Sequence, residues 1–329
     1  MKFGIALLPV FALETSASEI LDAILLQVRT ARESGFSSIW AAHHYLTDSG
    51  QIFQSLPLLA RAAAEGPGMT FGTSVFLLPY SHPVEVAEQT ATLDIITGGR
   101  LIFGAGLGYR AEEFRAFGIT KRQGVERLVE SIEVLKLLWT GDHINYQGKH
   151  FQLTDATINP KPLQKPRPPI WVGADSEHGV RRAAEISDSW LISPRHSLSF
   201  IKSLAKIYYD RRLQLKKPLD ALPIFRELHV AENRDTAVNE VRRFVEGMYH
   251  TYARWKQPGE KYDLSFDELR GERYIIGSPE DCIEEVERIR REVKVNLMFF
   301  RIYWPGMDPA YAIKTIKLFG EKIIPYFKD

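Results

Sequence analysis

The strongest constraint on the fold of this chain is its alternation of short apolar or β-branched runs with longer segments of helical periodicity. The strand candidates are residues 2–8, 37–41, 69–75, 100–106, 169–173, 189–193, 223–230 and 296–302. The helix candidates are residues 17–34, 55–65, 83–96, 121–139, 177–187, 197–215, 234–254 and 279–293, with a last one near 309–323. Eight strands, each followed by a helix, are what a (β/α)8 TIM barrel requires, so we expect an α/β fold of that class.

Two stretches exceed the length of a minimal barrel. Residues 142–168 begin with a predicted hairpin, DHINYQGKHFQL, and continue as a proline-rich loop, while residues 255–273 are polar and aperiodic. Both are interpreted as insertions in the loops that follow strands. Because the chain shows no internal repeat and no low-complexity tract, we expect residues 1–329 to form one barrel domain that carries these two insertions.

The charge of the chain is nearly balanced, with 42 Lys and Arg against 41 Asp and Glu and a formal net charge of +1. A protein that follows nucleic-acid phosphates or lies on a membrane surface needs a basic excess, so we expect neither partner. Cys282 is the single cysteine, which excludes an intrachain disulfide and fits a cytoplasmic protein. The N-terminus lacks a signal-peptide pattern and no apolar run is long enough for a membrane span.

Two adjacent histidines, His43 and His44, follow the second predicted strand, at the carboxyl end where barrel enzymes place catalytic side chains. Successive residues of a strand point to opposite faces, so we expect only one of them to face the barrel interior while the chain stays extended. A histidine at that position is suited to proton transfer near neutral pH. The competing interpretation is a histidine whose ring is satisfied by backbone partners.

Glycines recur after the fourth predicted strand, at Gly104, Gly106 and Gly108. A dinucleotide fingerprint is a weak interpretation, because Tyr109 stands where its third glycine belongs. Two alternatives remain. The glycines allow a flat ligand to approach the backbone, or they serve only tight packing.

The fifth predicted strand ends in Gly173-Ala174-Asp175-Ser176, directly before a predicted helix. Free amide groups and the positive end of the helix dipole would bind a phosphate there, together with the Ser176 hydroxyl. The simpler alternative is an ordinary Asp or Ser cap of the helix. The sequence alone favours the cap.

The remaining histidines are scattered and form no HxH or HExxH pair. A metallohydrolase barrel would need several of them at strand ends together with acids, and His44, His229 and Asp175 are the only set that suggests itself. We therefore expect no metal site.

Five longer segments carry a family resemblance. They are GFSSIWAAHHY (35–45), FGTSVFLLPYSHPVEVAEQTATLDIITGGRLIFGAGLGYRAEEFRAFGI (71–119), ERLVESIEVLKLLW (126–139), PPIWVGADS (168–176) and WPGMDPAYAIKTIKLFGEKIIPYF (304–327). Together they resemble the luciferase-like family of flavin-dependent oxidoreductases. The resemblance implies a TIM barrel that holds reduced FMN, or the deazaflavin F420, at the carboxyl ends of its strands.

The resemblance also assigns expected roles to residues. Counting the family's Trp-x-x-Glu-His-His pattern from Trp40 places His43 at the Glu position, His44 at the first His and Tyr45 at the second, so His44 inherits the role of catalytic base. The bond between Ser74 and Val75 matches a non-prolyl cis peptide under the flavin ring.

Asp175 and Ser176 match the family's phosphate loop. Leu107 replaces an arginine that contacts the flavin phosphate in bacterial luciferase, so Arg110 or Arg127 would have to supply a cationic contact. The residues expected to contact the cofactor are Ala42, Thr73, Ser74, Val75, Gly106, Tyr109, Arg110, Arg127, Ala174, Asp175 and Ser176.

The activity that the resemblance implies is a two-component monooxygenase, which takes reduced FMN from a separate flavin reductase and uses O2 on a small organic substrate. One alternative is an F420-dependent oxidoreductase that transfers hydride. Another is a flavin-binding protein without turnover. The resemblance further implies a homodimer.

Overall fold

The computed structural model describes residues 1–7, 13–48, 50–254 and 265–328. Eight parallel strands form the barrel, in the spatial order β10, β12, β1, β2, β3, β5, β8, β9. They are β1 (Lys2–Leu7), β2 (Ser38–Ala41), β3 (Thr70–Thr73), β5 (Leu101–Gly106), β8 (Ile170–Gly173), β9 (Ser189–Leu191), β10 (Leu222–Val230) and β12 (Val295–Arg301). The barrel closes between β9 and β10 through a bridge of Ile192 with Ile224. All eight predicted strands and the predicted TIM barrel are confirmed.

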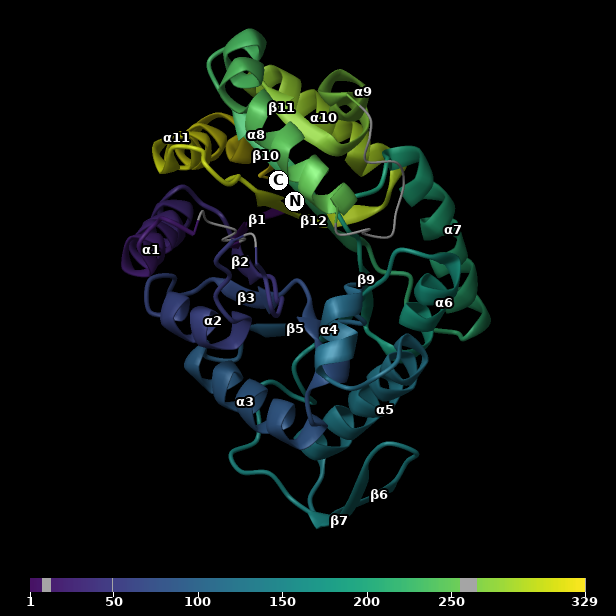
Figure 1. Ribbon diagram of the computed structural model, residues 1–329. Coiled ribbons are helices and arrows are strands. Elements are labelled where there is room, and N and C mark those ends of the chain that lie inside the picture. Colours follow the sequence, from purple (N-terminus) through teal and green to yellow (C-terminus); the bar gives the residue numbers. More distant parts are fainter. Residues whose placement is uncertain (8–12, 49, 255–264, 329) are drawn as a thin grey trace.

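The helices surround these strands (Figure 1). They are α1 (Ala17–Glu33), α2 (Ser55–Ala63), α3 (Pro83–Ile96), α5 (Lys121–Thr140), α6 (Glu177–Ile186), α7 (Leu198–Gln214), α8 (Arg234–Arg254), α10 (Pro279–Glu292) and α11 (Pro309–Leu318). The ends follow local chemistry: Gly35 takes a φ of +86° just after α1, and Ser278 and Asp281 form a reciprocal capping box around Pro279 at the start of α10. These helices confirm the sequence prediction to within two residues at most ends.

Two α-helices and two strands of the structure are absent from the sequence prediction. They are β4 (Phe76–Leu77), α4 (Ala111–Ala116), α9 (Phe266–Arg273) and β11 (Tyr274–Gly277). The predicted insertion at residues 255–273 ends in a helix begun by a Ser265–Glu268 capping box, where an aperiodic segment is expected. Residues 255–264 lie outside the described part. Strand β11 pairs with the carboxyl half of β10. The helices α4 and α9 were missed because six and eight residues are too few for a clear helical period.

The 142–168 insertion does contain the predicted hairpin, formed by β6 (Ile144–Gln147) and β7 (Gln152–Ala156). It projects from the barrel at the bottom of the view in Figure 1. The hairpin is fastened to α5 by Glu130, whose carboxylate accepts the backbone N–H groups of Lys149 at 3.1 Å, His150 at 2.9 Å and Phe151 at 3.3 Å. The insertion therefore packs against α5 on the outside of the barrel and leaves the order of the barrel strands unchanged.

Aromatic side chains fill the interior of the barrel. Trp40 stacks on Trp171 with ring centroids 5.2 Å apart and on Phe299 at 4.6 Å, and Phe225 stacks on Phe299 at 4.9 Å. Gly72 on the neighbouring strand makes room for Trp40, because a Cβ there would lie 2.2 Å from the indole ring. This apolar layer fills the barrel interior, and in such a fold ligands bind at the carboxyl ends of the strands.

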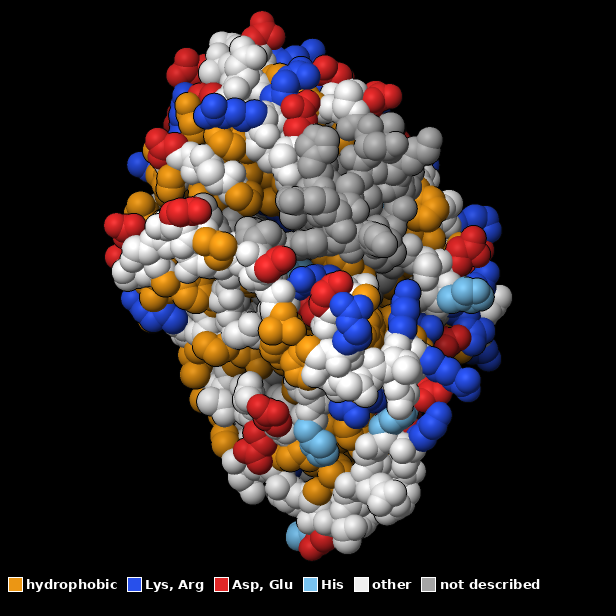
Figure 2. Space-filling model, in the orientation of Figure 1, with side chains coloured by type: hydrophobic (Ala, Val, Ile, Leu, Met, Phe, Trp, Pro, Cys, Tyr) orange, Lys and Arg blue, Asp and Glu red, His pale blue; other side chains and the backbone are white. Residues whose placement is uncertain are grey.

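Among the helices that the structure describes, none combines the length and apolar character that a membrane crossing requires. Acidic and basic side chains are interspersed over the face shown in Figure 2, as the balanced composition leads one to expect.

Candidate active site

A cavity of about 290 Å³ opens at the carboxyl ends of the strands. Its walls come from the segments after β2, β3, β5, β8 and β9, from α5 and α6, from Phe225 within β10 and from Arg301 at the end of β12. Nine of the predicted site residues line it: Ala42, His44, Ser74, Val75, Gly106, Tyr109, Ala174, Asp175 and Ser176. The fold thus brings together side chains that lie up to 134 positions apart in the sequence (Ala42 to Ser176).

His44 stands at the cavity wall and is held by a buried carboxylate. Its Nδ1 lies 3.1 Å from Oε1 of Glu113, whose side chain is fully buried, whereas the His44 side chain keeps 19 % of its exposure. The edge of the His44 ring faces the ring of Tyr109, with centroids 5.6 Å apart. A carboxylate accepts hydrogen bonds only, so the proton on this side belongs to Nδ1, and Nε2 is the ring atom that can take up a proton.

His43 also lines the cavity, so the expectation that only one histidine faces inward is wrong. Strand β2 ends at Ala41, and the alternation of faces ends with it. Nδ1 of His43 accepts the backbone N–H of Leu77 at 3.2 Å, and Nε2 contacts Oε1 of Gln54 at 2.5 Å. Burial lowers the pKa of His43 to about 4, although the contact with Gln54 opposes that shift. His43 is therefore neutral and structurally engaged at neutral pH.

The segment after β3 forms one wall of the cavity. The Ser74–Val75 peptide bond is cis, as the family resemblance leads one to expect. Val75 packs against two glycines: a Cβ on Gly106 would lie 2.2 Å from Cγ2 of Val75, and one on Gly173 would lie 2.9 Å from Cγ1. A Cβ on Gly104 would lie 1.9 Å from the backbone oxygen of Thr73. Tight packing inside the protein thus accounts for these glycines.

The loop after β8 carries Asp175 and Ser176. Ser176 caps α6, because its Oγ accepts the N–H of Gly179 at 3.3 Å. Asp175 forms an ion pair with Arg195 and lies 3.1 Å from Nε2 of His196. Burial opposes ionisation of Asp175, but Arg195 and His196 outweigh it and keep the pKa of this carboxyl below its ordinary value. The charge of Asp175 is thus balanced by neighbouring side chains.

The start of α6 retains the features of an anion site. The first N–H groups of a helix lack partners within the helix, and its dipole is positive at that end. Two cations, Lys121 at the start of α5 and Arg182 on α6, line the same cavity. Burial lowers the pKa of Arg182, and Glu185 opposes that shift. A phosphate at the start of α6 would therefore find both amide donors and positive charge.

Three predicted contact residues, Thr73, Arg110 and Arg127, do not line the cavity. The Thr73 hydroxyl is buried between strands, donating to the oxygen of Gly104 at 2.7 Å and accepting its N–H at 2.9 Å. Arg110 is buried and donates to the backbone oxygens of Tyr45 at 2.6 Å and Leu46 at 3.1 Å.

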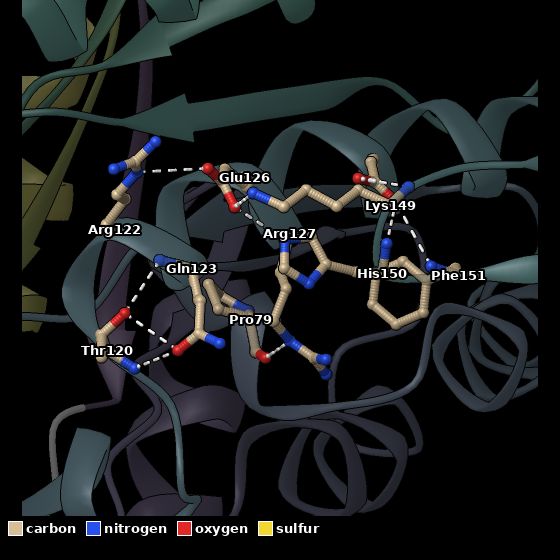
Figure 3. A network of polar contacts seen from close by, with 10 residues as sticks. Pro79, Thr120, Arg122, Gln123, Glu126, Arg127, Lys149, His150 and Phe151 are labelled. Carbon is tan, nitrogen blue, oxygen red and sulfur yellow. Dashed lines mark hydrogen bonds and ion pairs between the residues drawn. The ribbon is translucent and has the colours of Figure 1, made fainter.

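Arg127 lies on α5, in the network of polar contacts that Figure 3 shows. Its Nε donates to the oxygen of Pro79 at 2.7 Å, and its guanidinium lies 4.8 Å from the centroid of the Phe151 ring, on the hairpin. The prediction that Arg110 or Arg127 supplies the cationic contact thus places both charges wrongly. A sequence records a charge but not the direction of its side chain.

Sequence reasoning missed several groups of the site, chiefly Glu113, Lys121, Arg182, Arg195 and Arg301. Arg301 sits at the end of β12 and lines the cavity while pairing with Glu227 at 2.8 Å. A signal existed for Arg301, since charged residues at the end of an apolar strand are unusual. Glu113 had no such signal, because its partner lies 69 positions away.

The structure does not bring His44, His229 and Asp175 together as metal ligands. His44 contacts Glu113, His229 contacts Glu240 at 2.6 Å, and Asp175 contacts Arg195. In the part of the chain that the structure describes, no three side chains of His, Cys, Asp or Glu are grouped to hold a metal ion.

Comparison with known proteins gives a consistent result. The family model of the luciferase-like monooxygenases matches residues 1–296. An F420-dependent glucose-6-phosphate dehydrogenase of Microbacterium testaceum is 27 % identical over 94 % of this chain and 93 % of its own length. The oxygenase component of a flavin-dependent trigonelline monooxygenase of Acinetobacter baylyi is 25 % identical over 74 % of this chain and 68 % of its own length.

Among solved structures, monooxygenase RslO1 of Streptomyces bottropensis superposes with a TM-score of 0.90 at 24 % identity and full coverage of both chains. The F420-dependent tetrahydromethanopterin reductase of Methanopyrus kandleri gives a TM-score of 0.79 at 20 % identity, covering 99 % of each chain. At these identities the structural likeness shows the fold alone. The family match over most of the chain, with its enzyme relatives, shows more: the chain belongs to the luciferase-like monooxygenase family of oxidoreductases.

Proposed function

We propose that this chain is the oxygenase component of a two-component monooxygenase, which takes reduced FMN and O2 and acts on a small organic substrate. The observation that carries the proposal is that His44 and the start of α6 line the same, largely apolar cavity. The apolar part of the lining is formed by Val75, Leu77, Leu107, Leu128, Val172, Leu191 and Phe225. Such walls exclude water, which protects a reactive reduced cofactor from side reactions.

The residues present fit a phosphate-bearing flavin. The amides at the start of α6 and the charges of Lys121 and Arg182 would hold the phosphate. The apolar wall around Val75 would support the flat ring. When bound, reduced FMN would supply the electrons that activate O2, and His44 would hold or release the proton at Nε2. A flavin reductase would then be the partner protein.

The alternative function is F420-dependent hydride transfer. F420 carries a longer, more anionic tail than FMN, and Lys121 and Arg182 line the cavity in addition to Arg195 and Arg301, which pair with Asp175 and Glu227. Two of the F420-dependent glucose-6-phosphate dehydrogenases similar to this chain, from Microbacterium testaceum and Nakamurella multipartita, align with 94 % of its length. Both functions would use the same phosphate position and the same histidine.

We further propose that residues 1–329 act as one barrel domain, with the β6–β7 hairpin as an insertion, and that two copies form a homodimer in the cytoplasm. The described Cys282 is buried, and burial raises the pKa of its thiol, so it stays protonated and unreactive. Light scattering of the purified chain tests the dimer.

The function is tested by titrating the protein with reduced FMN under anaerobic conditions and, in parallel, with F420. Arg182→Gln should weaken binding of the preferred cofactor about tenfold, because it removes one charge from the phosphate position. Arg181→Gln is the matched control, since its neighbour Arg181 is exposed and does not line the cavity. Ser176→Asp keeps a good helix cap but adds a negative charge, so it should weaken binding by at least about tenfold.

Tighter binding of reduced FMN, followed by substrate-dependent O2 consumption with a flavin reductase, supports the oxygenase. Tighter binding of F420 supports hydride transfer instead. Binding of neither cofactor, or equal effects of Arg181→Gln and Arg182→Gln, would overturn the proposed site.

A further inference from the structure

The carboxylate of Glu113 is buried where the segments after β2 and β5 meet. Glu113 lies on α4, and its side chain has no exposed surface. Oε1 accepts the backbone N–H of Tyr45 at 3.0 Å and contacts Nδ1 of His44 at 3.1 Å, while a guanidinium nitrogen of Arg110 lies 3.6 Å away. A buried charge is costly unless donors surround it. Here two donors and one cation converge on the same oxygen.

Arg110 holds the same turn from the other side. Its guanidinium donates to the backbone oxygens of Tyr45 and Leu46, and Leu46 has a φ of +51°. Residues 44–46 are therefore held by hydrogen bonds at two backbone carbonyl groups, one backbone N–H group and one imidazole nitrogen. All four contacts come from residues 110 and 113, at the start of α4, so this short helix positions the loop that carries His44.

The contact with Glu113 sets which nitrogen of His44 carries the proton. A carboxylate accepts but does not donate, so the neutral His44 ring keeps its proton on Nδ1. In His43 the situation is reversed, because Nδ1 accepts the N–H of Leu77 and the proton therefore sits on Nε2, facing Gln54. The two adjacent histidines are thus held in opposite tautomers. Only His44 presents Nε2 as its proton acceptor.

We propose that Glu113 is a positioning residue that holds His44 in the Nδ1–H tautomer and stabilises the imidazolium formed when Nε2 accepts a proton. The proposal rests on the proposed function, in which His44 moves that proton. One proton leaves the reacting group and binds Nε2, the positive charge is balanced by the ionised Glu113, and no proton passes to the carboxylate itself. The same division of roles holds wherever a carboxylate orients a catalytic imidazole.

The tautomer is tested directly in the protein without added cofactor. Long-range 1H–15N correlation spectra distinguish Nδ1–H from Nε2–H rings, and His44→Asn assigns the His44 signals by their loss. We expect the neutral ring of wild-type His44 to be almost entirely the Nδ1–H tautomer. In Glu113→Gln, which preserves size and can still accept a hydrogen bond but lacks the charge, we expect a clear shift towards the Nε2–H form.

Glu112→Gln is the matched control, because Glu112 is the adjacent residue of α4 and its side chain is 55 % exposed. It should leave the His44 signals unchanged. Circular dichroism and thermal unfolding of each variant confirm that the barrel is intact. An unchanged tautomer in Glu113→Gln, or the same change in Glu112→Gln, would overturn the proposal.

Turnover with the preferred cofactor gives a second readout. Glu113→Gln should lower kcat at least about tenfold with KM changed by less than about twofold, since the effect is on proton transfer and not on binding. A tautomer shift in Glu113→Gln combined with full turnover in both Glu113→Gln and His44→Asn would overturn the function proposed for His44, while the pairing itself would stand on the spectra.

Discussion

His43 should make the folded state sensitive to acid. Its pKa is about 4 in the folded protein, against 6.5 for an ordinary histidine, and burial is the main cause. Below pH 6.5 the unfolded chain takes up a proton that the folded chain does not, so stability falls as the pH falls. The stability that the folded state gains by keeping His43 neutral is fully present above pH 6.5 and is lost as the pH falls towards 4. At pH 4.5 the loss amounts to roughly 2.5 kcal/mol, from about 1.4 kcal/mol for each unit of pKa difference.

The perturbation that isolates this effect is His43→Asn. The asparagine carbonyl can replace Nδ1 as acceptor for the N–H of Leu77, but it cannot titrate. The variant should be less stable than the wild type at pH 7.5, because the contact with Gln54 and part of the packing are lost. The gap between the two proteins should then shrink by about 2.5 kcal/mol between pH 7.5 and pH 4.5.

The assay is urea unfolding at a series of pH values, compared as differences between wild type and variant. Taking differences removes the contributions of other groups, such as buried His229, whose pKa is also lowered by burial. His143→Asn serves as the control, because that side chain is 77 % exposed and its φ of +52° suits asparagine. A gap between wild type and His43→Asn that stays constant with pH would refute the buried, neutral state of His43.

Two further predictions concern the packing of a glycine and the attachment of the hairpin. Gly104→Ala should lower the free energy of unfolding by about 1–3 kcal/mol, because the new Cβ would lie 1.9 Å from the backbone oxygen of Thr73. The control is Gly271→Ala, which has open space around it and should change the free energy of unfolding by less than about 1 kcal/mol. Urea unfolding measures both variants, and equal effects would contradict the packing argument. Glu130→Ala removes the shared acceptor of the backbone N–H groups of residues 149–151, so it should speed their amide hydrogen exchange at least about tenfold. Exchange in the barrel strands should stay unchanged. Unchanged exchange at residues 149–151 would mean that other contacts hold the hairpin.

Much of the fold was predictable because its signals are local. The strands are short apolar runs, and α10 starts at a capping box with proline at its first position. The six residues of α4 carry no comparable signal, and the apolar run of β11 is only four residues long and directly follows a helix. Tertiary contacts stabilise them: β11 pairs with the carboxyl half of β10, and residues at the start of α4 form hydrogen bonds with the turn at residues 44–46.

The site was predictable in its position but less so in its chemistry. Loops at strand ends converge on the mouth of a barrel, so His44, Val75 and Ser176 were expected near one another. The charges were misplaced, because a long side chain reaches several ångströms in a direction that only the packing decides. Arg127 turns towards the hairpin, while Arg182, one turn into α6, lines the cavity.

Strand β10 pairs with β12, with the residue after β9 and with β11, and the pairings occupy different parts of its length. Along its first half it joins β12 and meets β9 at the closing bridge, and along its second half the flank away from β12 receives β11. The ring is therefore complete without β11. Changes in α9 or β11 can therefore alter this flank of β10 while the register of the ring and the contacts of α4 with His44 stay intact, so these two parts of the molecule can vary independently.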